Sequence, residues 1–378
     1  MTNYPLALAP GMGINAFFAF SICVGMGIPW QSALGLVFIN GGIFLLLSVT
    51  GVREKILNAI PLSLKIAVSA GIGLFIAFIG LQNGGLIVAN RDTMVGLGDL
   101  SRPDVLLFCG GVILTLVLVA RKIPGAIILS MVIIAAAGLC VPGPGGQPVT
   151  LLPARIVSWP ESLAPTFLQL NFDLVFQDHL KALPIILTLL LVDMFDNIGT
   201  LIGVTRRAGI MDSEGRVPRV GRVLIADSIA AILSSLIGTS TVVSYIESAA
   251  GVQAGGRTGL TAVTTGACFL AALFLTPVIL AIPAVAVAPA LVAVGIVMFE
   301  GVVDLDLRRF ETAAPAVLTI LTMPLAFSIS TGIGIGLITL TALALATGHR
   351  RDVTAITYGL AAVFFLHFLE PVLATWFR

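Results

Sequence analysis

The fold of this chain is decided by a stretch in its second half, Gly238–Gly251, which reads GTSTVVSYIESAAG. The stretch is apolar overall, but its β-branched residues, its glycines and the carboxylate of Glu247 predict extended or broken backbone followed by a short helix. A second stretch of this kind, Leu6–Phe18 with the sequence LALAPGMGINAFF, lies near the N-terminus. Irregular backbone at membrane depth is tolerated only where protein buries it or where it lines a cavity. Interrupted segments at matching places in two halves therefore indicate a transporter site between inverted repeats, the alternative being two glycine-rich helix-packing interfaces.

The composition excludes a soluble globular protein. Of the 378 residues, 58% are hydrophobic and 10% are charged, against about 25% charged residues in an average soluble domain. Since a membrane-spanning helix uses about 20 apolar residues, the length leaves room for on the order of a dozen spans. The net charge of +1 leaves no basic face for nucleic acid. We therefore expect an all-α polytopic protein of the inner or plasma membrane, in contact with the lipid bilayer and without a nucleic-acid partner.

Apolar runs of spanning length fall into two sets separated by a polar, proline-rich interval at 142–181. We expect this interval to be an extramembrane linker between two halves, 1–141 and 182–378. No Asp, Glu, Lys or Arg precedes Arg53, so the opening does not resemble a signal peptide and is expected to lie within or at the edge of a span. The expected runs are 6–27, 31–51, 60–84, 103–120 and 123–141 in the first half, and 182–205, 220–238, 240–253, 258–280, 283–300, 312–347 with a break at Ser330–Gly332, and 354–374 in the second.

Basic residues in the short loops predict the orientation of the spans. The cluster of Arg53 and Lys55 is assigned to the first cytoplasmic turn, and the alternation of later clusters is consistent as far as Arg309. The cysteines show no CxxC spacing, which argues against a disulfide framework or a metal site. Each is expected to be a small buried hydrophobic residue, and they are Cys23, Cys109, Cys140 and Cys268.

Acids inside apolar runs are the sharpest functional candidates, because a charge at the bilayer centre costs at least about 2.5–3.5 kcal/mol. Asp193, Asp196 and Thr200 are spaced three and four residues apart, so they share one face of a helix. Asp193 could equally bond a neighbouring helix. For Asp227 a structural bond to the broken segments is favoured, since no helix break accompanies it. Asp196 and Glu247 stand beside breaks, where backbone groups also face a cavity, and both are assigned to function.

Ring side chains near these segments could stack on a flat heterocycle. They are Phe17, Phe18, Phe195 and Tyr245, although with 21 Phe in the chain each Phe is more often packing than a ligand platform. Asn15 could bond either a substrate edge or the opposing broken segment. Neither a GxxxxGKS/T phosphate loop nor an HExxH motif occurs, so the sequence predicts no ATP-driven pump and no zinc protease. Transport would then be driven by an ion gradient or by the gradient of the substrate itself.

Three regions of the chain resemble the azaguanine-type purine permeases of the nucleobase and ascorbate transporter superfamily. They are Asn3–Phe18, Val192–Val204, and Gly238–Gly251 together with Gly255–Val263. The resemblance implies a seven-plus-seven inverted-repeat fold with a core domain and a gate domain, in which 1–141 supplies segments three to seven and 182–378 supplies segments eight to fourteen. It also implies a homodimer that takes up adenine, guanine or hypoxanthine with protons, without enzymatic activity, a cofactor or a metal.

The same resemblance implies the residues of the site. The essential acids of the family fall on Asp196 and Glu247, and a neutral purine offers N–H donors to carboxylates that can also carry a proton. Backbone N–H groups near Asn15 and Ser248 would bond the acceptors of the ring. Substrate binding is expected from Asp196, Glu247, Asn15, Phe17, Tyr245, Ser248 and Thr200, and proton coupling from Glu247, Asp196 and Asp193.

Members of that family have two further spans before the Tyr4–Ala7 segment. Two spans with their connections take about 60 residues. We therefore expect this chain to lack the first two transmembrane segments. Two alternatives stay open, which are a uracil, xanthine or anion carrier of the same fold, and a truncated membrane protein that binds purine without transporting it. The residues neither rank the three purines nor distinguish a proton from sodium as the coupling ion.

Overall fold

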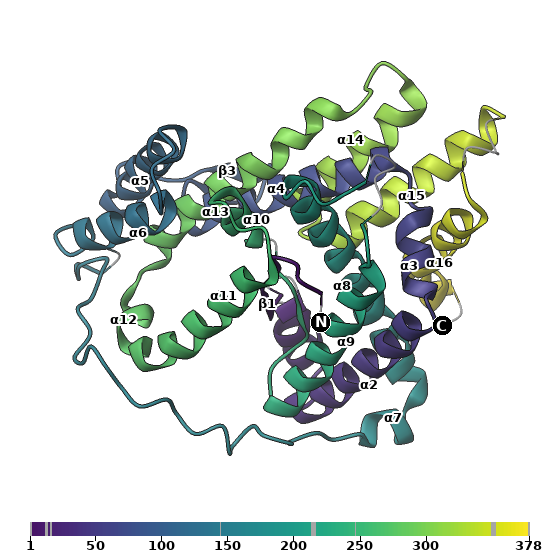
Figure 1. The fold of residues 1–378 in the computed structure, drawn as a ribbon, viewed down its shortest axis with the longest axis horizontal. Helices are drawn as coiled ribbons and strands as arrows, with labels where there is room; N and C mark the ends of the chain where they lie inside the picture. Colours follow the sequence, from purple (N-terminus) through teal and green to yellow (C-terminus); the bar gives the residue numbers. More distant parts are fainter. Residues whose placement is uncertain are drawn as a thin grey trace. The chain divides into compact units, whose positions relative to one another are not determined.

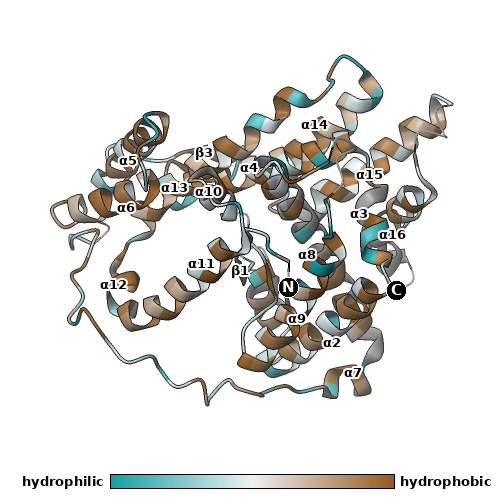
Figure 2. Cartoon of the chain, in the orientation of Figure 1, coloured by the Kyte–Doolittle hydropathy of each residue, from teal (hydrophilic) through white to brown (hydrophobic). Residues whose placement is uncertain are grey.

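The computed structural model describes residues 2–11, 14–15, 17–143, 145–212, 217–245, 247–348 and 353–376. These residues form a helical protein with two short two-stranded sheets (Figure 1). Hydrophobic residues cover most of the helices, and hydrophilic residues gather in the connections (Figure 2). In chain order the elements are β1 (Leu8–Pro10), η1 (Phe17–Gly25), α2 (Trp30–Val49), α3 (Val52–Ala59), α4 (Leu62–Asn83), β2 (Ile87–Asn90), β3 (Met94–Leu97), α5 (Pro103–Ala120), α6 (Ala126–Ala137), α7 (Asp173–Gln177), α8 (His179–Arg207), α9 (Val220–Ile237), β4 (Val242–Ser244), α10 (Ser248–Gln253), α11 (Gly259–Ala272), η2 (Leu273–Leu275), α12 (Thr276–Ala281), α13 (Ala284–Phe299), η3 (Glu300–Asp304), α14 (Phe310–Leu325), α15 (Ile329–Ala346) and α16 (Ala355–Trp376).

Within the described part of the chain, six helical stretches are long and apolar enough to cross a membrane. They are Trp30–Val49, Leu62–Asn83, Pro103–Ala120, Val220–Ile237, Gly259–Ala281 and Ala284–Asp304. Each of them coincides with a run expected from the sequence, to within a few residues at either end. The runs at 6–27 and 240–253 are different, because each contains a strand before its helix. The expected broken backbone of these two segments is therefore confirmed.

Two sequence expectations need correction. The break in 312–347 precedes the expected Ser330–Gly332, because α14 ends at Leu325 and the Ser328 hydroxyl oxygen caps α15 by accepting a hydrogen bond from the Thr331 amide at 3.2 Å. Of the cysteines, Cys23 and Cys109 are partly buried, but Cys140 and Cys268 are exposed in the isolated chain. An apolar run does not imply burial in a membrane protein, since lipid can cover it; none of the residues of α11, which carries Cys268, is buried.

The chain divides into two compact units, each of which draws on both halves of the sequence. Unit 1 comprises Met1–Gly71, Ser162–Val263 and Gly301–Arg378, and unit 2 comprises Ile72–Glu161 and Thr264–Glu300. Both broken segments and all the candidate acids belong to unit 1.

Unit 2 is built around contacts of α13 with α5 and α6. At Gly295 a Cβ atom would lie 2.7 Å from the Cβ of Ala77, so the glycine allows α13 to approach α4 closely. The unit also contains a hairpin of β2 and β3 that the sequence analysis did not predict. Its turn is closed by the Asn90 side-chain oxygen, which accepts hydrogen bonds from the amides of Asp92 at 2.8 Å and Thr93 at 3.1 Å.

Unit 1 places α2 directly against α9. At Gly41 a Cβ atom would lie 2.9 Å from Cγ1 of Ile232 and 3.1 Å from its amide nitrogen, so a glycine is required for this approach. A buried apolar cluster then joins α2 and α8 to both broken segments. It includes Ile14 and Ile22 after β1, Leu36 and Val37 in α2, Leu189 in α8 and Val243 in β4. The broken segments are thus seated in the core of unit 1.

Candidate functional site

The two broken segments pair with each other. Strands β1 and β4 form an antiparallel ladder in which Leu8 faces Ser244 and Pro10 faces Val242. The ladder continues beyond the strands, because the amide of Tyr245 donates to the carbonyl of Ala7 at 2.8 Å. Extended backbone inside a membrane protein needs such partners, since an unpaired amide in an apolar environment costs several kcal/mol. Each broken segment therefore supplies backbone hydrogen-bond partners to the other.

Side chains at the helix starts add a second set of bonds between the segments. The Ser248 hydroxyl oxygen, at the first residue of α10, accepts a hydrogen bond from the Ala7 amide at 3.0 Å. In the opposite direction, the Ser240 hydroxyl donates to the side-chain oxygen of Asn15. Of the two partners expected for Asn15, the opposing broken segment is the one observed. Its amide nitrogen, on an exposed side chain, can still donate to a ligand.

Asp227 anchors this strand pair to α9. Its Oδ1 accepts a hydrogen bond from the Ser244 amide at 3.2 Å, and its Oδ2 accepts one from Nη2 of Arg53 at 3.2 Å. Both side chains are buried, Arg53 completely. The interpretation of Asp227 as a structural bond to the broken segments is confirmed.

The polar face of α8 points into unit 1. Asp193 and Thr200 are buried, and so is Asn197, which lies between them on the same face. Asp193 Oδ2 accepts a hydrogen bond from the Asn40 side chain of α2 at 3.1 Å, so the contact with a neighbouring helix considered for this acid is present. Both β4 and α10 pack against α8. The polar face thus lies on the helix that supports the second broken segment.

Glu247 lies between the end of β4 and the start of α10, and its side chain is partly buried. Tyr245, two residues earlier, is partly buried as well and supplies the amide that extends the ladder. The structure therefore brings Tyr245, Glu247 and Ser248 to one end of the strand pair, next to Ala7, and places Asn15, which bonds Ser240, at the other end. The side chains of Asp196, Phe17 and Phe195 lie outside the described residues. Asp196 keeps its place in α8, one helical turn from both Asp193 and Thr200.

The sequence did not predict the burial of several polar side chains in this region, among them Arg53, Asn40 and Asn197. Arg53 was assigned to a cytoplasmic turn, and the structure adds that its side chain is buried against α2 and α9. A single Lys or Arg at the end of an apolar run is typical of a cytoplasmic loop, so the pattern does not indicate that the side chain is buried. Among the described residues, no group of three or more His, Cys, Asp or Glu side chains is arranged to hold a metal ion.

Comparison with known proteins places these features in a family context. The model of a xanthine/uracil-type permease family matches residues 1–335. The guanine/hypoxanthine permease PbuG of Bacillus subtilis is 46% identical over 98% of this chain and 82% of its own length. The adenine permease AdeQ of Escherichia coli is 39% identical over 96% of this chain and 80% of its own length. A putative permease of Methanocaldococcus jannaschii is 45% identical over 97% of this chain and 82% of its own length.

Solved structures agree on the fold. The transmembrane domain of the cyanobacterial bicarbonate transporter BicA matches with a TM-score of 0.59 and 16% identity, covering 89% of this chain and 85% of that one. The structure of SLC26A9 matches with a TM-score of 0.53 and 12% identity, covering 92% of this chain and 58% of that one. The chain is thus a helical, multi-pass membrane protein that matches transporters of the seven-plus-seven inverted-repeat fold.

Proposed function

Because the chain belongs to the xanthine/uracil permease family, we propose that it is a secondary active transporter of purine nucleobases, driven by protons. Adenine, guanine and hypoxanthine are the substrates named for the relatives that share 38–46% of its residues over at least 96% of the chain. The family members are permeases, so the chain is a transporter rather than an enzyme.

The observation that supports the proposal most directly is the pairing of β1 with β4 beside α8. Strands that interrupt membrane segments leave backbone groups and helix starts at membrane depth, where a small polar ligand can be held. A purine is planar and neutral, and its edge carries both N–H donors and ring-nitrogen acceptors. A site of this kind therefore needs carboxylate acceptors next to amide donors.

In this proposal Glu247 and Asp196 accept N–H groups of the purine, and the amide nitrogen of Asn15 donates to it. Ser248 and Thr200 provide hydroxyl groups at the edges of the site, while the rings of Tyr245 and Phe17 stack on the base. The proton is carried by Glu247 and Asp196, because a carboxylate that alternates between its two forms changes its affinity for an N–H donor. Asp193 is a weaker candidate for the proton, since it already accepts a bond from Asn40.

Uptake by the purified protein in proteoliposomes tests the proposal. We expect an imposed inward proton gradient to drive accumulation of radiolabelled adenine, guanine or hypoxanthine, and a protonophore to abolish it. A sodium gradient alone should be without effect. Competition by unlabelled uracil, xanthine and sulfate separates the alternatives, because a uracil, xanthine or anion carrier would be inhibited by one of these compounds and not by adenine, guanine or hypoxanthine. Binding of purine without gradient-driven uptake would contradict transport.

A further inference from the structure

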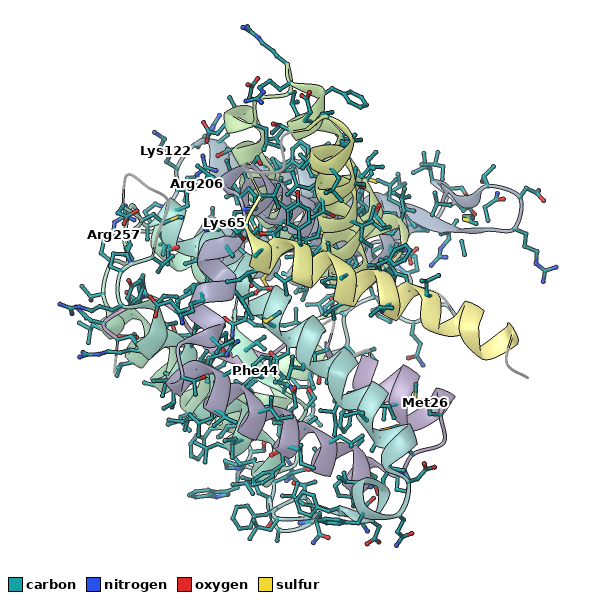
Figure 3. All side chains as sticks on the ribbon, turned by 90° about the vertical axis from the view of Figure 1, so that its right-hand side faces the viewer. Met26, Phe44, Lys65, Lys122, Arg206 and Arg257 are labelled. Atoms are coloured by element: carbon teal, nitrogen blue, oxygen red, sulfur yellow. The ribbon has the colours of Figure 1, made fainter. Side chains whose placement is uncertain are left out.

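Arg53 is the first charged residue of the chain and lies in α3, yet its side chain is fully buried. Its guanidinium carbon lies 4.2 Å from the centroid of the Phe44 ring, in a cation–π contact with α2. Phe44 itself lies in the interior of the unit (Figure 3). An arginine that only anchored a helix end at the membrane surface would extend its charge into water. The burial of Arg53 therefore indicates a role inside the protein rather than at the membrane surface.

The guanidinium group of Arg53 donates three hydrogen bonds to residues of α9. Its Nη2 donates to Oδ2 of Asp227 at 3.2 Å, and its Nη1 donates to the Ser228 hydroxyl at 3.3 Å and the Leu224 carbonyl at 3.4 Å. The Ser228 hydroxyl also contacts that of Ser48 on α2, at 3.2 Å. Planar, multiply bonded guanidinium groups fix the orientation of their partners, which a point charge does not. The bonds to Ser228 and Leu224 thus fix the guanidinium group on α9, and its bond to Oδ2 holds the carboxylate of Asp227.

The second carboxylate oxygen of Asp227 acts on the site. It accepts the amide of Ser244 at 3.2 Å, and Ser244 pairs with Leu8 in the ladder. Glu247 follows Ser244 by three residues. A chain of two hydrogen bonds therefore runs from Arg53, through Asp227, to the strand that leads into the candidate substrate-binding segment.

We propose that Arg53 is a positioning residue, which orients Asp227 so that this carboxylate fixes strand β4 and, with it, the place of Glu247 at the site. Arg53 does not touch the substrate. This proposal rests on the proposed function, because Glu247 is assigned to purine binding there. In this arrangement the position of β4 depends on a hydrogen-bond acceptor at residue 227 and on a guanidinium group that orients this acceptor.

Three variants separate the parts of this arrangement. R53M/D227N removes both charges but keeps a side-chain oxygen that can accept the Ser244 amide, whereas R53M/D227L removes the charges and the acceptor together. Neither leaves an uncompensated buried charge, so both are suited to insertion and folding. R53K keeps the charge but loses the planar fork. Monodispersity in detergent confirms that the variants are folded before they are compared.

The first readout is amide hydrogen exchange of a peptide covering 238–251, measured by mass spectrometry. This readout does not depend on transport. We expect exchange to be slowest in the wild type, faster in R53M/D227N and fastest in R53M/D227L, with R53K between the wild type and R53M/D227L. A peptide from Pro103–Ala120, in unit 2, serves as the internal control and should exchange equally in all variants.

The second readout is the KM for purine uptake. It should rise by at least about tenfold from the wild type to R53M/D227L, as expected when a hydrogen bond that positions a ligand-binding group is lost. R53M/D227N and R53K should give intermediate values. If the two double variants behave alike, the Ser244 bond is not the route and the proposal is wrong. If R53M/D227N and R53K both equal the wild type, Arg53 has no positioning role.

The two proposals fail in different ways. Absence of purine uptake by the wild-type protein would overturn the proposed function, while the exchange experiment would still decide whether Arg53 positions β4. Normal uptake by the wild type, with exchange and KM unchanged in every variant, would overturn the positioning role alone.

Discussion

The hydroxyl oxygen of Ser248 accepts a hydrogen bond from the backbone amide of Ala7, across a sequence separation of 241 residues, at 3.0 Å. The bond joins the first residue of a helix in the second half of the chain to the backbone that leads into β1 in the first half. It lies next to the strand ladder, where Leu8 faces Ser244. The geometry of the candidate site therefore depends on contacts between the two halves, and each contact can be tested separately.

Replacement of Ser248 by Ala removes the acceptor of the Ala7 amide. The loss of a hydrogen bond of this kind costs about 1 kcal/mol net, so we expect the KM for purine to rise roughly fivefold to tenfold. Ser130→Ala is the matched control, since the Ser130 hydroxyl bonds only a carbonyl of its own helix, that of Ile127. Equal kinetics in both variants would show that the bond to Ala7 has no bearing on the site.

Glu247→Gln and Asp196→Asn should each abolish gradient-driven uptake while the protein still inserts. An amide keeps the size of the carboxyl group but cannot take up a proton, and its weaker hydrogen bonds lower affinity by roughly 10- to 150-fold. Asp173→Asn is the control, because Asp173 is exposed at the start of α7 and bonds the side chain of Asn171. Near-normal uptake in either of the first two variants would remove that residue from the mechanism.

Asn15 and Ser240 should behave as a coupled pair, because the Ser240 hydroxyl donates to the Asn15 side chain. In a double-mutant cycle of Asn15→Ala and Ser240→Ala, we expect a coupling energy of about 0.5–3 kcal/mol, measured from purine-binding affinities. Pairing Asn15→Ala with Ser130→Ala, in the other unit, provides an additive reference. Additive effects of the first pair would mean that the bond does not contribute to binding.

Asp193→Asn distinguishes a structural acid from a proton carrier. Asn can still accept the hydrogen bond from Asn40, so we expect uptake to stay within about twofold of the wild type, with an unchanged dependence on external pH. Asp193→Leu removes the acceptor of the Asn40 bond and should lower the free energy of unfolding by about 1–3 kcal/mol. Uptake by Asp193→Asn that no longer responds to pH would instead assign proton coupling to this residue.

Neighbouring glycines of α2 give a stability test with an internal control. Gly41→Ala forces a Cβ against Ile232 and should destabilise the protein by about 1–3 kcal/mol, lowering its melting temperature. At Gly42 a Cβ would meet no atom within 4 Å, so Gly42→Ala should be neutral or stabilise the helix by roughly 0.5–1 kcal/mol. Fluorescence-monitored melting in detergent measures both. Equal melting temperatures would show that α2 and α9 are not closely packed.

Local sequence was sufficient to locate the broken segments, because both apolar runs contain residues that disfavour a regular helix. These are a proline and glycines in Leu6–Phe18, and glycines and β-branched residues, with an acid beside them, in Gly238–Gly251. Local sequence also indicated the role of Asp227, an acid within a run that has no break. The pairing of β1 with β4 was not predicted, since strands of three residues carry no register information at that separation. The burial of the Arg53 side chain was not predicted, because it depends on Asp227, a partner distant in sequence. The hairpin of β2 and β3 was missed because its exposed strands lack a regular alternation.

The ladder between β1 and β4 has a consequence for the synthesis of the protein. A ribosome that adds roughly 5–20 residues per second needs about 10–50 s to proceed from Ala7 to Ser248, which lie 241 positions apart. During that interval the amides of β1 have no strand to pair with, so water, the insertion machinery or provisional contacts must satisfy them. The candidate site therefore cannot form until β4 has been synthesised, and a nascent chain released before β4 emerges would carry an unpaired strand edge into the bilayer.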